Sequence, residues 1–531
     1  MKGAPPLTPL RLTVPDLHIG PSGVAPFCYP VTPRQTTAVL EAFIDALHQH
    51  LREKPPEAGT VSEALWIMFP VLCLDVIQIC HSIALLQRCK AAGYQPRGPF
   101  LDALAEGVVP PLSRRLAIGL RRPPRIPAWR QAARFVRSLM PQKGWFDYHQ
   151  PYSRSTNGRP LIFHQSSLLA NYAREQEERP LFTYPEDWLM PGERISGRGP
   201  DLSAEVRSMA KTAFAAGEET PSDVALAWLV RSASLSARWG AEQLAHLRSR
   251  RKIPKHFWVG TLGNPVYRVL SKVVRERGGE VTGFDHGMSS GLWDTPVQTV
   301  LEFDFADRFV TFSREMAAGL HGNWQPGRTL TGRCPELVFV RGLESSDTPS
   351  LPSCPKTPAH RPGKIIYVPT MYGGETVHLL PFFSDIQMVD WQARLLSFLR
   401  GQGYEVSIKP HPESVYPVPA ELAALVDGRV LAGRFEDLDL ADSVLLFDYP
   451  QTTAFVRACR SSNPIVVVDF GRLAIRPEAR QPFAARCALV EGGVADDGRL
   501  MMDWQALVAG LEMAPERMDQ TLGQRYFAGV A

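Results

Sequence analysis

The sequence lacks the cysteine patterns that hold metals or disulfide frameworks. Its eight cysteines include no Cys-x-x-Cys pair and no pairing with histidine at zinc-ligand spacing. This usage is typical of a protein whose thiols stay reduced, so we expect a cytoplasmic location and no structural zinc. The cysteines are Cys28, Cys73, Cys80, Cys89, Cys334, Cys354, Cys459 and Cys487.

A surplus of charge is missing too. Lysine and arginine total 58 and aspartate and glutamate total 54, for a net charge of +4. This near balance gives no reason to expect a nucleic-acid partner, although a local basic pocket is compatible with it. The length of 531 residues exceeds what one core supports, so two or three domains are expected.

No basic segment followed by an apolar run stands at the N-terminus, so no signal peptide is expected. One apolar stretch, residues 64–86, approaches the length of a membrane span. It contains Asp75, His81 and Pro70, which favours a buried helix of a soluble protein. The arginine-rich segment 112–138 is interpreted as a solvated helical face. Peripheral attachment to anionic lipid at the inner membrane is the alternative.

Strand and helix patterns begin to alternate near residue 251. Residues 255–263 and 280–287 are predicted buried strands, and residues 264–279 between them form a helix with an Asn cap and a first-turn proline. The alternation restarts after a Ser-, Pro- and Thr-rich stretch. Strands linked through helices indicate parallel sheets. We therefore predict an α/β protein with two Rossmann-like lobes facing a cleft and a helical N-terminal region.

The expected domains follow from these changes of pattern. The N-terminal region is either part of the first lobe or added to it. The domains are a helix-rich region over 1–250, a first lobe over 251–345, a linker over 346–363, a second lobe over 364–500 and a C-terminal helical segment over 501–531.

Residues 406–414, VSIKPHPES, present a cation and an imidazole at the end of a predicted strand. Proline restricts the residue before it, so Lys409 and His411 are both kept out of helical geometry. Ligands bind at the carboxyl ends of strands in open α/β sheets. Lys409 could neutralise a phosphate and His411 could donate a directional hydrogen bond to it. The alternative is a surface strand end with a chance histidine.

Two further strand ends of the second lobe carry candidate ligands for the donor. The stretch YVPTMYGGE ends a strand with Thr370 and with Gly373 and Gly374, whose backbone amides can approach a ligand closely. A plain loop is the alternative. In LLFDYPQTTAF, Gln451 precedes a helix opened by two threonines, Thr452 and Thr453. Hydroxyls and free amides there predict an anion site, whereas simple N-capping needs only one hydroxyl.

The first lobe offers a candidate base. GFDHGMSSGLWD ends a predicted strand with Asp285 and His286, and either side chain could face the cleft as a general base. The alternative is that His286 is a turn residue beside Gly287.

Four motifs, taken in chain order, resemble the inverting GT-B glycosyltransferases of bacterial surface polysaccharide assembly. They are FDHG at 284–287, YVPT at 367–370, KPHP at 409–412 and FDYPQTT at 447–453. KPHP is similar to the His-Pro motif of bacterial sialyl-, polysialyl- and Kdo-transferases, which use cytidine-activated donors. The same order is also similar to the glycerol- and ribitol-phosphate polymerases of teichoic acid synthesis. The resemblance covers residues 255–475 and leaves the helical N-terminal region unmatched.

The resemblance implies roles for the strand-end residues. His411 would contact the donor phosphate, and Thr452 and Thr453 would bind the same group. Asp285 or His286 would deprotonate the acceptor hydroxyl. The chain departs from the teichoic acid polymerases because Pro450 and Gln451 precede its hydroxyl pair.

The residues suit this chemistry on their own, since attack on an activated sugar needs a base and a stabilised leaving phosphate. No Asp-x-Asp turn stands at a strand end, and DLDL at 437–440 is interpreted as a loop or helix start. We therefore expect no essential metal and no cofactor apart from a nucleotide-sugar donor, CMP-linked.

The expected function is transfer of Kdo or a nonulosonic acid to a surface polysaccharide or lipid-linked glycan, with no nucleic-acid partner. The expected location is cytoplasmic, with peripheral inner-membrane association as an option. A CDP-glycerol or CDP-ribitol phosphotransferase of the same fold is the first alternative. A non-catalytic nucleotide- or sugar-binding protein is the second, and a hydrolysing UDP-sugar epimerase is less favoured.

Overall fold

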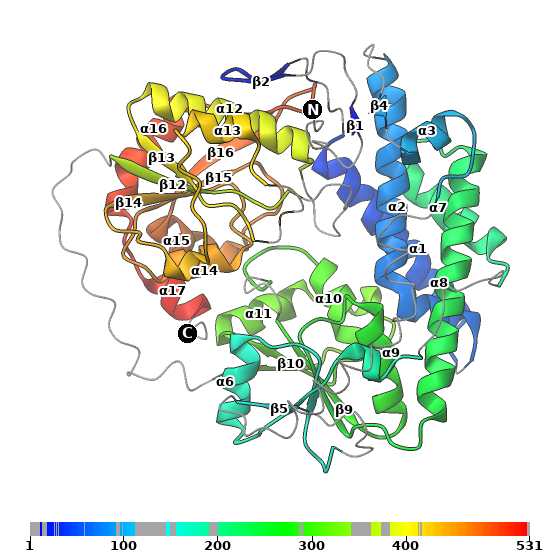
Figure 1. Ribbon diagram of the computed structural model, residues 1–531. Coiled ribbons are helices and arrows are strands. Elements are labelled where there is room, and N and C mark those ends of the chain that lie inside the picture. The colour runs from blue at the N-terminus through cyan, green and yellow to red at the C-terminus, as the bar shows by residue number, and fades with distance from the viewer. Residues whose placement is uncertain are drawn as a thin grey trace, which may run out of the picture.

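The chain folds into two α/β lobes with long helices packed beside them (Figure 1). The arginine-rich segment 112–138 and most of the predicted linker lie outside the described residues. The computed structural model describes residues 11–12, 18–25, 27, 29, 31–57, 59–91, 96–97, 99–111, 145–148, 156–190, 200–285, 290–340, 363–372, 383–412, 414 and 417–527.

The first lobe is built on a seven-stranded parallel sheet with the order β11-β10-β9-β8-β6-β7-β5. Three of these strands come from residues 147–182, which the sequence analysis placed in the N-terminal region, so the first lobe begins well before residue 251. The strands are β5 (Asp147–Tyr148), β6 (Leu161–Ile162), β7 (Leu181–Phe182), β8 (His256–Val259), β9 (Glu280–Phe284), β10 (Arg308–Thr311) and β11 (Glu336–Phe339).

Local signals determine the first lobe's main crossover helix, α9 (Pro265–Glu276). The Asn264 side chain accepts a hydrogen bond from the Val266 N–H at 3.0 Å, and proline fills the first turn. Gly278, at φ +73°, adopts the left-handed conformation that lets the chain leave the helix. The lobe's other helices are α6 (Ser167–Glu175), η1 (Pro185–Asp187), α10 (Val297–Glu302), η2 (Phe303–Phe305), α11 (Arg314–Asn323) and η3 (Pro326–Arg328).

The second lobe contains a six-stranded sheet with the order β13-β12-β14-β15-β16-β17, parallel except for the β16–β17 pair. Both sheets confirm the predicted α/β class. The sequence GRVLAG at 428–433 is typical of a strand, but no strand forms there, because only Val430 pairs, as an isolated bridge to Ile408. The strands are β12 (Lys364–Val368), β13 (Glu405–Ile408), β14 (Ser443–Phe447), β15 (Ile465–Asp469), β16 (Ala488–Val494) and β17 (Leu500–Met502).

Helices cover both faces of the second sheet, as in a doubly wound fold (Figure 1). Helix α12 opens with a capping box between Ser384 and Gln387. The helices are α12 (Asp385–Gly401), α13 (Ala420–Leu425), η4 (Phe435–Asp437), α14 (Thr453–Cys459), α15 (Pro477–Arg486), α16 (Trp504–Met513), η5 (Ala514–Glu516) and α17 (Thr521–Tyr526).

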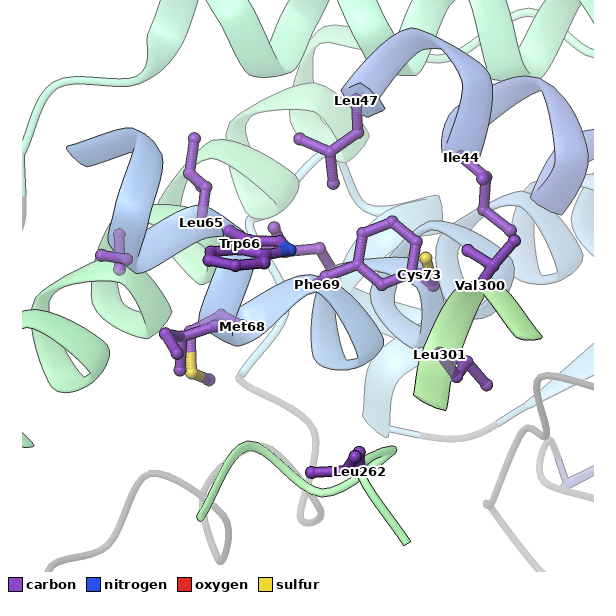
Figure 2. Close-up of a cluster of buried hydrophobic side chains, with 14 of the residues drawn as sticks. Ile44, Leu47, Leu65, Trp66, Met68, Phe69, Cys73, Leu262, Val300 and Leu301 are labelled. Carbon is purple, nitrogen blue, oxygen red and sulfur yellow. The ribbon is translucent and has the colours of Figure 1, made fainter. Parts of the chain in front are cut away.

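The N-terminal helices share a hydrophobic core with the first lobe. Figure 2 shows Trp66 and Phe69 of α2 in the same cluster as Leu47 of α1, with Leu262 and Val300 of the first lobe. A region that buries its apolar face against a lobe is part of the same folding unit. The helices are α1 (Pro33–Glu53), α2 (Val61–Ala91), α3 (Pro99–Ala105), α7 (Ser203–Ala216) and α8 (Asp223–Ser249).

Helix α2 contains the apolar stretch that approaches membrane-span length. It is long and apolar enough to cross a bilayer, a test that core helices of soluble proteins also pass. Of its most apolar window, 83% is buried within the protein. Asp75 on this helix accepts a hydrogen bond from the Ser232 hydroxyl of α8 at 2.5 Å, and burial raises the pKa of its carboxyl to about 7. The prediction of a buried helix is therefore confirmed.

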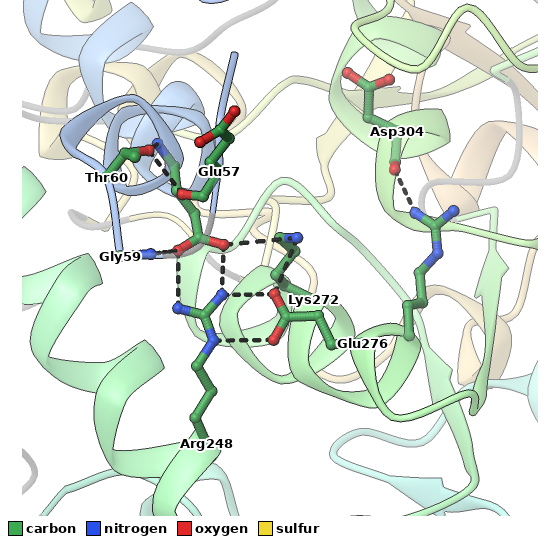
Figure 3. Close-up of polar contacts among 9 residues, drawn as sticks. Glu57, Gly59, Thr60, Arg248, Lys272, Glu276 and Asp304 are labelled. Carbon is green, nitrogen blue, oxygen red and sulfur yellow. Dashed lines mark hydrogen bonds and ion pairs between the residues drawn. The ribbon is translucent and has the colours of Figure 1, made fainter. Parts of the chain in front are cut away.

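A buried ionic network also joins α2 to the first lobe (Figure 3). The Glu63 carboxylate, 1% exposed, accepts two hydrogen bonds from Arg248 of α8, at 2.5 and 2.9 Å, and lies 3.5 Å from Lys272 of α9. Glu276 bonds the same arginine and lysine. Since removing one partner would leave an uncompensated buried charge, the network holds the three helices in register.

Residues 18–25 pack on the second lobe instead. A hairpin places the Val24 N–H 2.9 Å from the Asp390 carboxylate of α12. Arg499 donates to the Val24 carbonyl at 3.0 Å and pairs with Asp390 at 3.1 Å. The N-terminal region thus contacts both lobes. Its short strands are β1 (Arg11–Leu12), β2 (His18–Gly20), β3 (Gly23–Ala25) and β4 (Pro96–Arg97), paired as β1–β4 and β2–β3.

Candidate functional site

Three of the sequence motifs leave the second sheet side by side. Strand β12 lies between β13 and β14, with Tyr367 level with Ile408 and Val368 level with Phe447. The chain therefore exits towards Thr370, His411 and Gln451 at one edge of the sheet. Neighbouring strands lie about 4.8 Å apart, so the outer two exits are separated by about 10 Å.

Lys409 is not presented as the sequence analysis predicted. Its side chain is buried at 4% exposure, and its ammonium donates to the carbonyl of Pro410 at 2.9 Å. Burial lowers the pKa of Lys409, partly offset by the charge of Glu436. Lys409 therefore stabilises the loop in which it lies. His411, which is half-buried, is the more accessible of the two polar side chains in KPHP.

The two threonines at the start of α14 differ in role. The Thr452 hydroxyl accepts a hydrogen bond from the Phe455 N–H at 3.1 Å and is 7% exposed, so it serves as the N-cap. Thr453 is the first helical residue and is exposed. Thr452 is therefore the N-cap, as the alternative interpretation of this motif expects, and Thr453 is exposed to solvent.

Asp448 ties the strand exits together. Its carboxylate accepts hydrogen bonds from the Tyr367 hydroxyl of β12 and, at 3.1 Å, from the indole N–H of Trp391 on α12. Burial raises the pKa of Asp448 to about 6, although both of these hydrogen bonds favour the ionised form. This carboxylate therefore fixes the β14 exit relative to the β12 strand that carries Thr370.

The sequence analysis missed Arg472, which follows β15 after a glycine. Its guanidinium donates to the Gln451 side-chain oxygen at 3.0 Å and lies over the Tyr449 ring, 3.9 Å from the ring centre. Burial lowers the pKa of Arg472, opposed by Tyr449 and then Asp448. The sequence signal that could have identified Arg472 is its position shortly after a buried strand.

A pocket at this edge lies between the lobes, because Trp293 of the first lobe forms one of its walls. Arg472 and Gln451 line it together with the acidic side chains Asp448 and Asp469. The remaining lining residues are Pro450, Val467, Val468, Phe470, Leu473, Ile475, Phe483 and Leu489. The predicted cleft between the lobes therefore corresponds to a real hollow at the carboxyl ends of β14 and β15.

Some predicted site residues lie outside the described residues. They are His286, Gly373 and Gly374. Of the two candidate bases, the structure therefore describes Asp285.

Asp285 is a buried carboxylate at the end of a first-lobe strand. It directly follows β9, is 4% exposed, and its Oδ1 accepts a hydrogen bond from the Ser290 hydroxyl at 2.7 Å. Its Oδ2 has no hydrogen-bond partner in the part of the chain that the structure describes. Burial raises the pKa of Asp285 to about 6. A carboxylate with one free oxygen and a pKa near neutrality can accept a proton from a hydroxyl.

A second buried carboxylate, Glu302 of α10, holds the neighbouring strand exit. It accepts a hydrogen bond from the Thr261 hydroxyl at 2.8 Å and another from the Leu262 N–H at 2.5 Å. Burial raises the pKa of Glu302 to about 7, and the charge of Asp285 adds to the rise. The two carboxylates therefore lie within electrostatic range of each other, and Glu302 fixes the loop beside Asp285.

The lobes are joined next to the pocket. Trp293 pairs with Ile475 in an antiparallel bridge, and the Arg476 N–H donates to the Leu292 carbonyl at 3.0 Å. The Arg476 guanidinium donates to the Asn323 side-chain oxygen at 2.6 Å. These contacts determine the distance between the two sets of strand ends.

Replacing Arg476 with alanine should loosen the lobes, because it removes a charge-assisted hydrogen bond worth about 1.5–3 kcal/mol. X-ray scattering in solution should show a larger radius of gyration, and thermal unfolding should show a lower midpoint. Arg434→Ala, which removes an exposed pair with Asp437, is the control and should change neither quantity. A radius and a midpoint equal to those of the wild type would contradict the joining role of Arg476.

The two α/β lobes with parallel sheets agree with the predicted GT-B type of fold. No family model and no curated protein matches the chain in sequence. Solved structures that are similar at low level include two that use nucleotide sugars by name. One is a putative UDP-N-acetylglucosamine 2-epimerase from Listeria monocytogenes, with a TM-score of 0.34 and 11% identity over 70% of this chain and 93% of that one. The other is a UDP-glucosyltransferase from Polygonum tinctorium capable of glucosylating indoxyl, with a TM-score of 0.35 and 13% identity over 71% and 94%.

Proposed function

We propose that this protein is an inverting glycosyltransferase that moves Kdo or a nonulosonic acid from a CMP-activated donor to a surface polysaccharide or lipid-linked glycan. It would act in the cytoplasm or at the inner face of the membrane. The observation that carries the proposal is that polar groups follow strand ends in both lobes. Asp285 offers a free carboxylate oxygen at the first-lobe edge, and His411, Thr453 and Gln451 lie at the second-lobe edge.

The chemistry follows from these positions. The acceptor hydroxyl gives its proton to Asp285 Oδ2 while its oxygen forms a bond to the anomeric carbon. The bond from that carbon to the phosphate oxygen breaks, and CMP leaves with the electron pair. His411 donates a hydrogen bond to the phosphate as this charge develops. The Thr453 hydroxyl donates a second hydrogen bond to the phosphate. Arg472 orients the Gln451 amide by donating a hydrogen bond to its oxygen.

A nucleotide-binding panel tests the donor class. We expect CMP to raise the unfolding midpoint more than UDP or GDP does. At a CMP concentration of 100 times its Kd, the free energy of unfolding should rise by about 2.7 kcal/mol. His411→Ala should reduce the CMP effect, since the imidazole contacts the phosphate.

The other outcomes overturn parts of the proposal. Stabilisation by UDP alone would exclude a cytidine donor. Greater stabilisation by CDP than by CMP would favour the CDP-glycerol or CDP-ribitol phosphotransferase. Stabilisation by CMP without transfer of any sugar would favour a binding protein that has no catalytic activity.

A further inference from the structure

Asp448 has one unpaired oxygen atom and lines the pocket between the lobes. Its Oδ2 accepts hydrogen bonds from the Tyr367 hydroxyl and the Trp391 indole N–H, whereas its Oδ1 has no partner in the described part of the chain. The Thr370 N–H also favours the ionised carboxyl, but no hydrogen bond joins it to Oδ1. An ionised carboxylate only accepts hydrogen bonds, and Asp448 is 5% exposed. Its Oδ1 is therefore a buried acceptor that a ligand can satisfy.

Arg472 brings unused donors to the same pocket. A guanidinium has five N–H donors. One of them bonds the Gln451 oxygen at 3.0 Å, and no carboxylate among the described residues lies within ion-pair distance of Arg472. The guanidinium carbon lies 3.9 Å from the centre of the Tyr449 ring and 5.4 Å from that of the Phe383 ring. Two aromatic rings therefore hold the group in place while most of its donors stay unused.

The acceptor and the donors come from adjacent strand exits. Asp448 directly follows β14, and Arg472 lies three residues beyond its neighbour β15. The charge of each residue affects the pKa of the other, yet the two form no ion pair. Both therefore remain available to one ligand. The pocket also has aromatic walls, formed by Trp293, Phe470 and Phe483.

A ligand that donates at one position and accepts at the next matches these two side chains. The pairing edge of cytosine has this order, since its N4 amine donates while its N3 and O2 atoms accept. Carboxylate side chains are the usual acceptors for that amine. In uracil the first two positions are reversed, so a carbonyl would face Asp448 and an N–H would face Arg472. Both contacts would then be repulsive, which gives a basis for discrimination between the two bases.

We propose that Asp448 and Arg472 select cytosine as the base of the nucleotide donor. Asp448 Oδ1 accepts a hydrogen bond from the N4 amine, and the Arg472 guanidinium donates to N3 and O2. The base enters the pocket by this edge and packs against its aromatic walls. The inference rests on the proposed function, which requires a cytidine donor, and it adds the residues that determine this specificity.

Asp448→Asn tests the acceptor directly. The Tyr367 and Trp391 donors should hold the amide oxygen at the position of Oδ2, so the amide nitrogen replaces Oδ1 and donates a hydrogen bond there. Calorimetric titration of the wild type should show that CMP binds about 10–100-fold more tightly than UMP, as expected for a base-specific pair. In Asp448→Asn this preference should disappear or reverse in favour of UMP.

Further probes complete the test. Arg472→Met should weaken CMP binding about 10-fold, because the hydrogen bonds to N3 and O2 are lost. N4,N4-dimethyl-CMP has no N4 donor and should bind the wild type about as weakly as UMP, a result that depends on no substitution. Asp75→Asn changes a buried carboxyl on α2, and Arg434→Ala changes an exposed arginine of the second lobe. Both controls should bind CMP and UMP as the wild type does.

The failures are distinguishable. If the wild type binds neither nucleotide, or prefers UMP, the cytidine donor of the proposed function fails and this inference falls with it. If the wild type prefers CMP and Asp448→Asn keeps that preference, only the inference is overturned. Equal binding of CMP and N4,N4-dimethyl-CMP by the wild type would also overturn it, even if Asp448→Asn did not fold, and would leave the proposed function in place.

Discussion

Replacing His411 with alanine is expected to lower kcat about 100–1,000-fold, the loss typical of removing one donor that stabilises developing charge. The imidazole lies at the β13 exit, on a segment framed by two prolines, so its position changes little between substrate and transition state. Since the side chain is only half-buried, the unfolding midpoint should change by no more than a few degrees. Single-turnover kinetics and thermal unfolding measure both effects.

His50→Ala is the matched control for this prediction. His50 is also half-buried but lies on α1, away from both sets of strand ends. It should keep full turnover. If His411→Ala retained wild-type kcat, the assignment of the leaving phosphate to the KPHP loop would be wrong. If it lost activity only by unfolding, the role of the residue would be structural.

Replacing Asp285 with asparagine should cause the second large loss of activity, about 100–10,000-fold, because the amide accepts no proton from the attacking hydroxyl. In the wild type, activity should rise through pH 6 as this carboxyl ionises, since burial raises the pKa of Asp285 to about 6. The pH dependence of kcat/KM for CMP-sugar hydrolysis measures this limb. The limb should be missing from the residual activity of the variant.

The same substitution should stabilise the fold at neutral pH. The folded pKa of Asp285 lies above its unfolded value, so the folded state holds the proton more tightly and loses stability as pH rises from about 4 to about 6. Asparagine removes the charge that burial penalises, and the gain should be about 1–3 kcal/mol at pH 7. Denaturant unfolding at pH 4 and pH 7 tests this, because the difference between variant and wild type should shrink at the lower pH.

Asp75→Asn is the control that distinguishes the effect of removing a buried charge from the loss of a catalytic base. Asp75 is a buried carboxyl whose pKa is raised to about 7 for the same physical reason, but it lies on α2 and bonds Ser232. This variant should also gain stability at neutral pH and should keep its activity. Equal loss of activity in both variants would indicate that Asp285 acts through the fold and is no base.

The second lobe was predictable from sequence because its signals are local. Two of its central strands contain runs of four apolar residues, 444–447 and 465–468, and its helix α14 opens with a threonine cap. The first lobe was predictable only in part. Strands β5, β6 and β7 have two residues each, too few for any period to appear, and they exist because distant strands pair with them.

The candidate site divides in the same way. Asp285, His411 and Gln451 could be proposed from the sequence because each follows a recognisable strand end. Arg472 and Glu302 could not, because their contacts are with side chains and backbone far away in the chain. Lys409 was found but misjudged, since no local pattern predicts that its ammonium bonds the next carbonyl.

The amino-acid sequence by itself determined that this protein is α/β, that its strands end in polar loops and that its apolar helix α2 is buried. These properties depend on hydrophobic period, caps and prolines within a few neighbouring residues. Only the tertiary structure decided which strand ends share an edge and which carboxylates lose water. It also decided that Arg476 and Trp293 hold the lobes together. Strand order and burial arise from contacts between residues far apart in the chain, and no short stretch of sequence contains them.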